Sequence, residues 1–302
     1  MNKIIVVTGQ TATGKTSYAI KLAQEMSGEI INCDSRQLYK HLDIITGKDT
    51  KKDSIFNYQF SINSFDVGFY MLQGIKFWLY DVVDPKIPFS SFDYKELALQ
   101  VIADIISRGK IPIIVGGSYL YIKHLLYGFS ENVAPDWKLR NTLEDLSVVD
   151  LRGKLQILNN DRLQKMNNSD RNNPRRLIRQ IEIATIQSIP TSNLTPEVKF
   201  EIERYVGLRF KDVNKLVLNI KERVQKRLEQ GAIEEIESLL KMGYAKHDPG
   251  LNTIGYKEII VYLEGKMSKQ ETIDRWVLSE IQYAKRQYTF MKKDTNIKWK
   301  DV

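Results

Sequence analysis

An apolar run that breaks directly into a glycine-rich loop constrains this chain of 302 residues most. Residues 4–7 (Ile-Ile-Val-Val) precede Gly9-Gln10-Thr11-Ala12-Thr13-Gly14-Lys15-Thr16, which fits the phosphate-loop pattern G-x-x-x-x-G-K-[ST] at every fixed position. In such a loop successive backbone N–H groups point at phosphate oxygens, Lys15 adds a positive charge, and the Thr16 hydroxyl can ligate Mg²⁺. Residues 17–26 should form a helix whose positive N-terminal end faces the same anion. The motif therefore predicts a polyphosphate site in a strand–loop–helix unit.

A carboxylate follows the second expected strand. Residues 28–32 should form a short buried strand, which the chain leaves through Cys33-Asp34-Ser35-Arg36-Gln37-Leu38-Tyr39. Ligands of a doubly wound parallel sheet bind outside the carboxyl ends of the strands, so Asp34 and the phosphate loop should open into one crevice. A carboxylate beside a polyphosphate is electrostatically unfavourable, which makes Asp34 a candidate to bind Mg²⁺ or to take a proton from a nucleophile. The alternative is an aspartate that only caps the next turn.

The amino-acid composition is that of a globular protein and excludes disulfide-rich and zinc-binding classes. An apolar content of 42% is ample for a packed core. The net charge of +8 suits anionic partners such as nucleic acid or pyrophosphate, and equally a charge that only keeps the protein soluble. One cysteine excludes an internal disulfide framework, and three scattered histidines offer no zinc spacing. The chain starts directly with a core strand and has no apolar run of transmembrane length, so no signal peptide, no membrane span and a cytoplasmic location are expected.

Strand and helix patterns alternate to about residue 128, which predicts an α/β fold built on a doubly wound parallel sheet of the phosphate-loop type. A helix is expected over 91–108 and a strand buried on both faces over 111–115. Residues 56–62 alternate between apolar and polar, and residues 75–80 are expected to be their hairpin partner.

Residues 129–196 are charged, asparagine-rich and without a strand pattern. They predict an all-helical subdomain inserted into a core formed by residues 1–128 and 197–302. Its last helix should begin after Asn172-Asn173-Pro174 and carry Arg175 and Arg179 one turn apart, either as a row that contacts phosphates or as a solvated charged face.

The chain should then return to the core through C-terminal helices. Leu216, Ile220, Val224 and Leu228 form a core stripe that leaves Arg223 and Arg227 on another face, and two further helical stretches are expected over about 231–242 and 269–293.

Taken together, these segments resemble the tRNA dimethylallyltransferases, also called tRNA isopentenyltransferases. The Asp-Ser-Arg-Gln segment at its distance from the phosphate loop is the most specific match. Further matches follow in the same order: Asp81-Val82-Val83-Asp84-Pro85, Pro112 to Tyr121, Asn173-Pro174-x-Arg176-Leu177, Ile220-x-x-Arg223-Val224, Ile254-Gly255-Tyr256-Lys257-Glu258, Ala284-Lys285-Arg286-Gln287 and Trp299. The chain departs from the family at Phe77-Trp78, where relatives usually have two histidines, and at Ser118, which replaces the usual threonine and keeps its hydroxyl.

The resemblance implies transfer of a dimethylallyl group from dimethylallyl diphosphate to the N6 amine of the adenine 3′ of the anticodon in tRNA, with Mg²⁺ as cofactor and a monomer as the working form. Asp34 would be the base, with Thr11 and Arg223 as further catalytic residues. Diphosphate would be bound by Gly9, Thr11, Ala12, Thr13, Gly14, Lys15, Thr16 and Arg223, with Thr16 on the metal. The anticodon stem-loop would be bound by Asp34, Ser35, Arg36, Gln37, Ser118, Arg140, Asn172, Asn173, Pro174, Arg175 and Arg176.

Three other functions use some of the same features. An adenylate dimethylallyltransferase would prenylate free AMP, ADP or ATP, and a phosphate-loop kinase would use the arginines of residues 171–179 as a lid. A basic RNA-binding switch protein would sense nucleotide without forming product. The helical insertion and the long basic C-terminal part favour tRNA, because a small acceptor would not need them.

Overall fold

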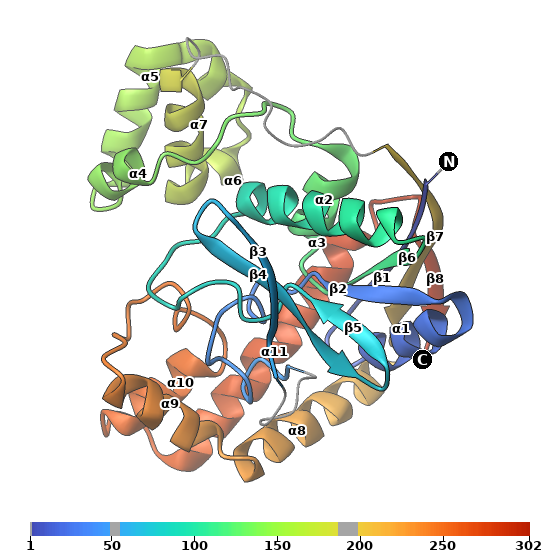
Figure 1. Ribbon diagram of the computed structural model, residues 1–302. Helices are drawn as coiled ribbons and strands as arrows, with labels where there is room; N and C mark the ends of the chain where they lie inside the picture. Colours follow the sequence, from blue (N-terminus) through green and yellow to red (C-terminus); the bar gives the residue numbers. More distant parts are fainter. Residues whose placement is uncertain (1, 49–54, 187–198) are drawn as a thin grey trace. The chain divides into compact units, whose positions relative to one another are not determined.

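The computed structural model describes residues 2–48, 55–186 and 199–302 (Figure 1). Contacts divide the chain into two units, one formed by residues 1–126 and 195–302 and the other by residues 127–194. The sequence predicted a helical insertion over residues 129–196. Within the described residues, no helix combines the length and the apolar character that a bilayer crossing requires.

The first unit contains a sheet and seven helices among its described residues. Its strands are β1 (Asn2–Gly9), β2 (Gly28–Asn32), β3 (Asn57–Ile62), β4 (Phe65–Leu72), β5 (Ile75–Trp78), β6 (Ile111–Val115), β7 (Phe200–Arg209) and β8 (Lys298–Asp301). Its helices are α1 (Lys15–Met26), α2 (Ser91–Ser107), α3 (Tyr119–Tyr127), α8 (Val213–Glu229), α9 (Ala232–Lys241), α10 (Tyr256–Leu263) and α11 (Lys269–Met291). The helices expected over 17–26, 91–108, 231–242 and 269–293 are therefore present.

The sheet has the strand order β3-β4-β5-β2-β6-β1-β7-β8. The pairs from β5–β2 to β7–β8 in this order are parallel, whereas the pairs β3–β4 and β4–β5 at one edge are antiparallel. The α/β class and the parallel sheet around the phosphate loop are thus confirmed, with a mixed edge that the sequence analysis did not assign to the sheet.

Alternate side chains of the central strands point to opposite faces of this sheet. Ile4 and Val6 of β1 pack into the large core that also contains residues of α2, α8 and α11. Ile5 and Val7 point the other way and pack with Leu22 of α1. Burial on both faces explains why the central strands are continuous apolar runs in the sequence.

The hairpin prediction was wrong in its pairing. β3 pairs with β4, which the sequence analysis missed, and β5 pairs with β4 on one side and in parallel with β2 on the other. Asn63 and Ser64 join β3 to β4 with φ of 48° and 69°. Two adjacent residues with positive φ form a short turn whose twist suits an antiparallel hairpin.

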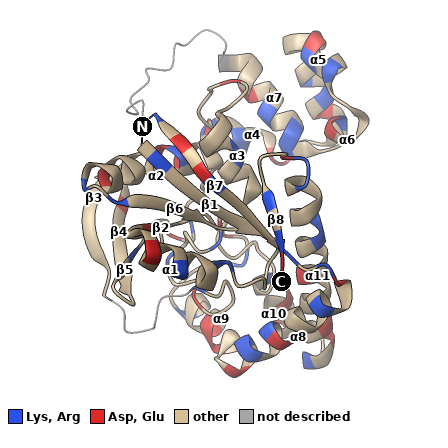
Figure 2. Ribbon diagram, turned by 90° about the vertical axis from the view of Figure 1, so that its right-hand side faces the viewer, with Lys and Arg blue, Asp and Glu red and all other residues tan. Residues whose placement is uncertain are grey.

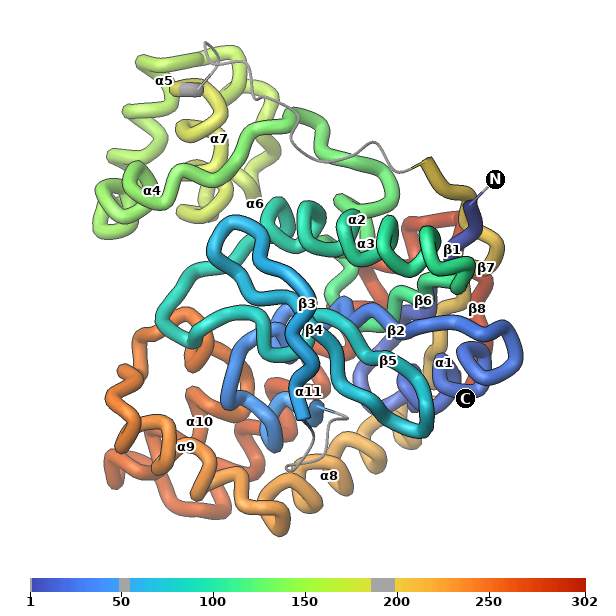
Figure 3. Tube along the Cα trace, in the orientation of Figure 1, coloured from blue at the N-terminus to red at the C-terminus, as the bar shows by residue number. Residues whose placement is uncertain are grey.

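A second strand was also missed. The chain re-enters the first unit through β7, not through helices as expected, and then continues into α8 (Figure 3). Phe200 and Ile202 alternate with Glu201 and Glu203, a strand pattern that the sequence does contain.

The second unit is helical. Its helices are α4 (Trp137–Leu143), α5 (Val148–Lys165), α6 (Asn168–Arg171) and α7 (Pro174–Ile186). Leu151 and Leu155 of α5 pack with Leu177 and Ile181 of α7 in a core of its own. Helix α7 begins at Pro174, as predicted from the asparagine pair before it.

A buried carboxylate explains one departure from the family pattern. Glu29 of β2 accepts a hydrogen bond from the Trp78 indole N–H at 2.8 Å and is paired with both terminal nitrogens of Arg108. Burial alone would raise the pKa of Glu29, but the bonds from Arg108 and Trp78 outweigh it and lower this pKa below its ordinary value. Trp78, which stands where relatives usually have histidine, is therefore a buried structural residue.

Replacing Glu29 by Gln should lower the free energy of unfolding by about 2 kcal/mol at neutral pH, because hydrogen bonds between charged groups are lost. The folded-state pKa of Glu29 lies below the unfolded one, so this contribution is present above the unfolded pKa and is lost as the pH falls through the folded one. Thermal denaturation should show the gap between wild type and variant closing below about pH 4. Glu264→Gln, at an exposed carboxylate that pairs with two lysines, is the control and should leave the melting temperature unchanged. Equal losses in the two variants would contradict this account.

Candidate active site

A cavity of about 170 Å³ opens at the phosphate loop in the first unit. Its lining includes the loop residues from Thr11 to Thr16, together with Asp34, Gln37 and Arg223. These predicted site residues come from segments far apart in the sequence. The structure therefore brings the predicted phosphate site, the predicted base and the predicted arginine into one cavity.

The loop takes its shape from two glycines. Gly9, at the end of β1, has φ of 139°, and a Cβ there would lie 2.1 Å from the Leu208 carbonyl oxygen. Gly14 has φ of 75° and immediately precedes α1. Both positions require glycine, the first for close approach and the second for left-handed backbone. The turn delivers the N-terminus of α1, with its outward N–H groups, to the cavity.

Lys15 is held by the loop itself. Its Nζ donates to the Gln10 carbonyl at 2.7 Å, and the Thr13 hydroxyl donates to the same oxygen at 2.8 Å. The ammonium group thus lies over the loop, where an anion would be bound.

Asp34 leaves the end of β2 in a tight turn. Its Oδ1 accepts the Arg36 N–H at 2.9 Å, while the Asp34 N–H donates to Oδ1 of Asn32 at 3.0 Å. The aspartate therefore caps the next turn and also lines the cavity. One oxygen is engaged by this turn, and a carboxylate has further acceptor capacity for a substrate.

Ser118 joins this turn to the end of β6. Its Oγ accepts the Ser35 N–H at 2.9 Å and contacts the Ser35 hydroxyl at 3.1 Å. The serine at this position thus makes, with its hydroxyl alone, the contact that fixes the Asp34 turn. Arg36 is half-buried at the same turn.

Two arginines stand one turn apart on α8. Arg223 lines the cavity, and its Nε is buried without a hydrogen-bond partner among the described residues. Arg227, which the sequence placed on another face than the core stripe, is itself buried and is paired with Glu280 of α11 at 3.0 Å. Burial and then the neighbouring charge of Arg223 lower the pKa of Arg227 to about 10. With this pKa, Arg227 remains charged at neutral pH, and the pair of guanidinium groups gives this wall of the cavity a positive potential.

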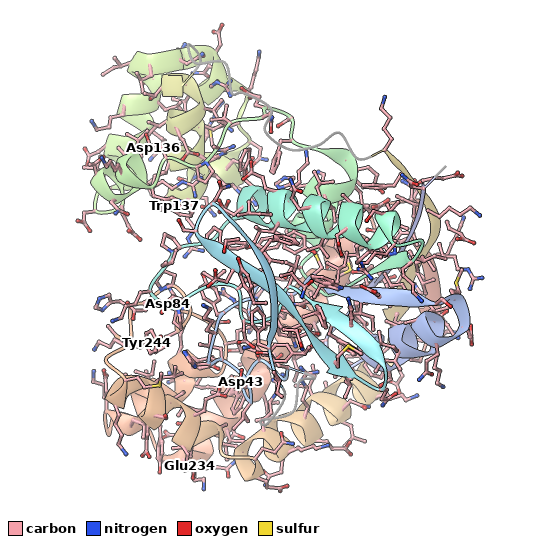
Figure 4. All side chains as sticks on the ribbon, viewed as in Figure 1. Asp43, Asp84, Asp136, Trp137, Glu234 and Tyr244 are labelled. Carbon is pink, nitrogen blue, oxygen red and sulfur yellow. The ribbon has the colours of Figure 1, made fainter. Side chains whose placement is uncertain are left out.

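The loop after Asp43, a residue labelled in Figure 4, supports the arginine wall of the cavity. Thr46 accepts a bond from Arg223 at 3.4 Å, and Gln37 donates its side-chain N–H to the Gly47 carbonyl at 2.8 Å. The Glu235 carboxylate of α9 accepts the backbone N–H groups of residues 43–45. Burial raises the pKa of Glu235, although these N–H groups oppose the shift.

The predicted site residues did not include seven residues that line the cavity: Ser17, Gly47, Tyr80, Val115, Gly116, Tyr283 and Gln287. Tyr283 and Gln287 lie one turn apart on α11, near the far end of the chain. Burial raises the pKa of the Tyr283 phenol, and the Asp34 charge raises it further, so the phenol stays protonated. The family segment around Ala284-Lys285-Arg286-Gln287 was a signal that this helix matters, but it did not say which side chains face the cavity.

The remaining predicted tRNA contacts lie in the second unit. Glu182, which is fully buried, accepts bonds from Arg140 at 2.8 and 2.9 Å and also from Arg179. Burial would raise the pKa of Glu182, but these two arginines lower it. Arg140 also stacks over Trp137 at 4.6 Å, at the start of α4 (Figure 4). These arginines thus have structural partners within their own unit.

The start of α7 presents a different environment. Arg176 is paired with Asp170, and Asn173 accepts the Arg176 N–H at 3.3 Å. Asn172 donates its side-chain N–H to the Asn168 carbonyl at 2.8 Å, and Arg175 is exposed. Basic residues recur along α7 (Figure 2).

Comparison with known proteins identifies the family. The family model described as IPP transferase matches residues 37–294, and the one described as isopentenyl transferase matches residues 2–55. The chain belongs to the IPP transferase family. A tRNA dimethylallyltransferase of Acetivibrio thermocellus is 36% identical over 99% of this chain and 91% of the relative, and tRNA dimethylallyltransferase 1 of Citrifermentans bemidjiense is 36% identical over 98% and 91%. The resemblance drawn from the motifs is confirmed.

Solved structures of other IPP transferases agree. The full-length tRNA isopentenylpyrophosphate transferase of Bacillus halodurans has a TM-score of 0.68 and 29% identity, covering 100% of this chain and 90% of that one. A eukaryotic dimethylallyltransferase acting on tRNA has a TM-score of 0.75 and 25% identity, covering 100% of this chain and 74% of that one.

Replacing Gly47 by Ala should weaken binding of inorganic diphosphate about tenfold, as expected if Arg223 loses one charge-assisted hydrogen bond to the anion. A Cβ at residue 47 would lie 2.9 Å from Nη2 of Arg223 and 2.8 Å from Nη2 of Arg227, so the flexible guanidinium groups must move. Isothermal titration with diphosphate measures the change.

Gly74→Ala is the matched control. Gly74 has φ of +76°, close to the +66° of Gly47, but nothing lies within 4 Å of its Cβ position. Both variants carry the strain of left-handed backbone, about 1 kcal/mol, and only the first should lose affinity. Unchanged affinity in Gly47→Ala would remove Arg223 from the anion site.

Proposed function

We propose that this chain transfers a dimethylallyl group from dimethylallyl diphosphate to the N6 amine of the adenine 3′ of the anticodon in tRNA, releasing diphosphate. The observation that supports this most is the single cavity in which a phosphate loop and Arg223 face the same space as the Asp34 carboxylate. The relatives named above are tRNA dimethylallyltransferases or act on tRNA, so the acceptor is proposed from them.

The chemistry needs both ends of this cavity. The exocyclic amine of adenine is a poor nucleophile because its lone pair is delocalised into the ring, so the electrophile must be strongly activated. The bond between the allylic carbon and diphosphate breaks while the bond from N6 to that carbon forms. Negative charge grows on the leaving group, and positive groups held in place before the reaction stabilise it. The N–H groups at the start of α1, Lys15, the Thr11 hydroxyl and Arg223 are placed for this role.

The proton of the amine leaves toward Asp34. Its Oδ1 is fixed by the Arg36 N–H, which orients the carboxylate, and its remaining capacity can accept a bond from N6. As N6 forms its new bond to carbon, its proton becomes acidic and passes to this carboxylate. The base thereby serves first to orient the amine and then to neutralise it.

The residues present fit a magnesium ion. Thr16 at the start of α1 lines the cavity, and the described residues contain no cluster of three or more His, Cys, Asp or Glu side chains that could hold a metal by themselves. Mg²⁺ commonly keeps several waters and binds through one protein oxygen and substrate phosphates. Bound by Thr16 and the diphosphate, it would neutralise part of the charge of the leaving group.

The target base must be reachable. An adenine stacked in an anticodon loop has to be turned out before its amine can enter a cavity. Four polar side chains at the Asp34 turn are proposed to hold the edges of the adenine ring: Ser35, Arg36, Gln37 and Ser118. A monomeric working form and a cytoplasmic location stay predictions.

Asp34→Asn should lower kcat roughly 10²-fold or more, the usual contribution of a positioned proton acceptor, while tRNA affinity falls much less. Asparagine keeps an Oδ1 that can accept the Arg36 N–H, so the turn should survive the change. Single-turnover prenylation of tRNA with a saturating donor and a filter-binding assay measure the two quantities. Near-normal turnover in this variant would rule out Asp34 as the base.

The salt dependence of tRNA affinity separates tRNA from a free nucleotide as acceptor. Each arginine that neutralises a phosphate releases counterions, so Arg175→Ala should reduce the slope of log affinity against log salt by about one. Arg175 is exposed, whereas Arg140 and Arg179 already face buried Glu182 and should contribute less. Arg140→Ala is the comparison variant, and prenylation of AMP is assayed in parallel. A flat salt dependence in wild type together with prenylated AMP would favour the adenylate enzyme.

A further inference from the structure

The side chain of Gln287 on α11 joins two loops of the active site. Its Oε1 accepts the Thr11 N–H at 2.9 Å, and its Nε2 donates to the Gly117 carbonyl at 3.0 Å. Gln287 is buried and lines the cavity. One amide group near the C-terminus thus holds the phosphate loop near the N-terminus to the segment that follows β6.

The second loop is shaped to admit this side chain. A Cβ at residue 117 would lie 2.2 Å from Nε2 of Gln287, so glycine is required for the contact. Ser118 follows directly, and its Oγ accepts the Ser35 N–H beside Asp34. Its N–H donates to the Cys33 carbonyl at 3.3 Å. The connection from Gln287 therefore continues, through two short steps, to the turn that carries the base.

The contact with Thr11 also changes what the phosphate loop offers. A backbone N–H that is bonded to Gln287 is not directed at a phosphate oxygen. Thr11 can then contact diphosphate through its hydroxyl, while the backbone donors come from the loop residues after it. The phosphate loop is thus held by Gln287 at Thr11, while the N–H groups of its later residues can bind the anion.

We propose that Gln287 is a positioning residue that fixes the distance between the diphosphate leaving group and the Asp34 base. The inference rests on the proposed function. In the reaction the allylic carbon must lie between the leaving oxygen and N6, and a misplacement of about 1 Å can cost about 10²-fold in rate. In the proposed function, diphosphate binds at the phosphate loop and adenine at the Asp34 turn, so binding of either substrate alone should depend little on the bridge between them.

Gln287→Met tests this, because methionine has a similar length, is uncharged and makes neither hydrogen bond. The single-turnover rate of tRNA prenylation should fall roughly 10²-fold. The dissociation constants of dimethylallyl diphosphate and of tRNA, each measured alone, should change less than about threefold, since each substrate is proposed to bind at one end of the bridge. A merely structural defect would weaken binding as well and would not produce this split.

Tyr288→Phe is the matched control on the same helix. The Tyr288 hydroxyl accepts a bond from Arg209 of β7 at 2.7 Å, so this variant also loses one link between α11 and the sheet. Its melting temperature should fall, while its prenylation rate stays within about threefold of wild type.

Gly117→Ala should disrupt the same bridge, because its Cβ would displace the Gln287 side chain. This variant provides the test if Gln287→Met does not fold. It should show the same split, and the double variant should be no slower than the slower single one, because both changes break one connection. Normal turnover in these variants, or a loss of donor affinity that matches the loss of rate, would overturn the assignment. A wild-type protein that prenylates no tRNA would instead refute the proposed function.

Discussion

The active site depends on the close approach of the Gly116 backbone to the Cys33 backbone, which leaves no room for a side chain at residue 116. A Cβ at Gly116 would lie 1.9 Å from the Cys33 carbonyl oxygen. The Gly116 N–H donates to the Val7 carbonyl at 3.1 Å, and its carbonyl accepts the Thr8 hydroxyl at 2.9 Å. The ends of β1, β2 and β6 therefore meet at this residue. Because the phosphate loop leaves β1 and the Asp34 turn leaves β2, their separation is set by how closely these three strands approach.

Charge distribution explains why the cavity suits a doubly phosphorylated group. Lys15 and Arg223 face the space directly, and Arg227 stands behind with Glu280 as its partner. The protein assembles these like charges during folding, so an anion meets them already in place and no reorganisation is needed as bond breaking begins. The repulsion within the cluster is a cost that the buried Glu280 partly offsets.

The sequence was sufficient to predict the structure of segments whose conformation is determined by a few neighbouring residues. The phosphate loop, the Asp34 turn and the helix that starts at Pro174 are short motifs whose residues dictate their own backbone. Pairing between distant strands was not predictable in this way, because β3 could have met either β4 or β5 with the same alternation of side chains. Strand β7 was missed although its alternation is visible.

The same distinction holds for side chains. The roles of Gln287 and Gly47 come from helices that fold back onto the loop, and no neighbouring residue in the sequence indicates them. Arg140 was predicted as a tRNA contact from the family resemblance, and Arg179 as a phosphate contact from its spacing to Arg175. Their partner Glu182 is far from Arg140 in the chain, so its burial between them could not be deduced from the sequence.

The bond between Thr11 and Gln287 has a consequence for how the protein is made. The ribosome completes the phosphate loop well before the helix that holds it, because Gln287 follows Thr11 by 276 residues. Until α11 has emerged and packed, the nascent chain carries the full motif without its support. Bringing two residues so far apart in the chain into contact costs more conformational entropy than forming a local helix, and contacts of this kind slow folding. The enzyme therefore cannot become competent domain by domain as it is translated, and a truncated chain would retain the signature of a phosphate site without its working geometry.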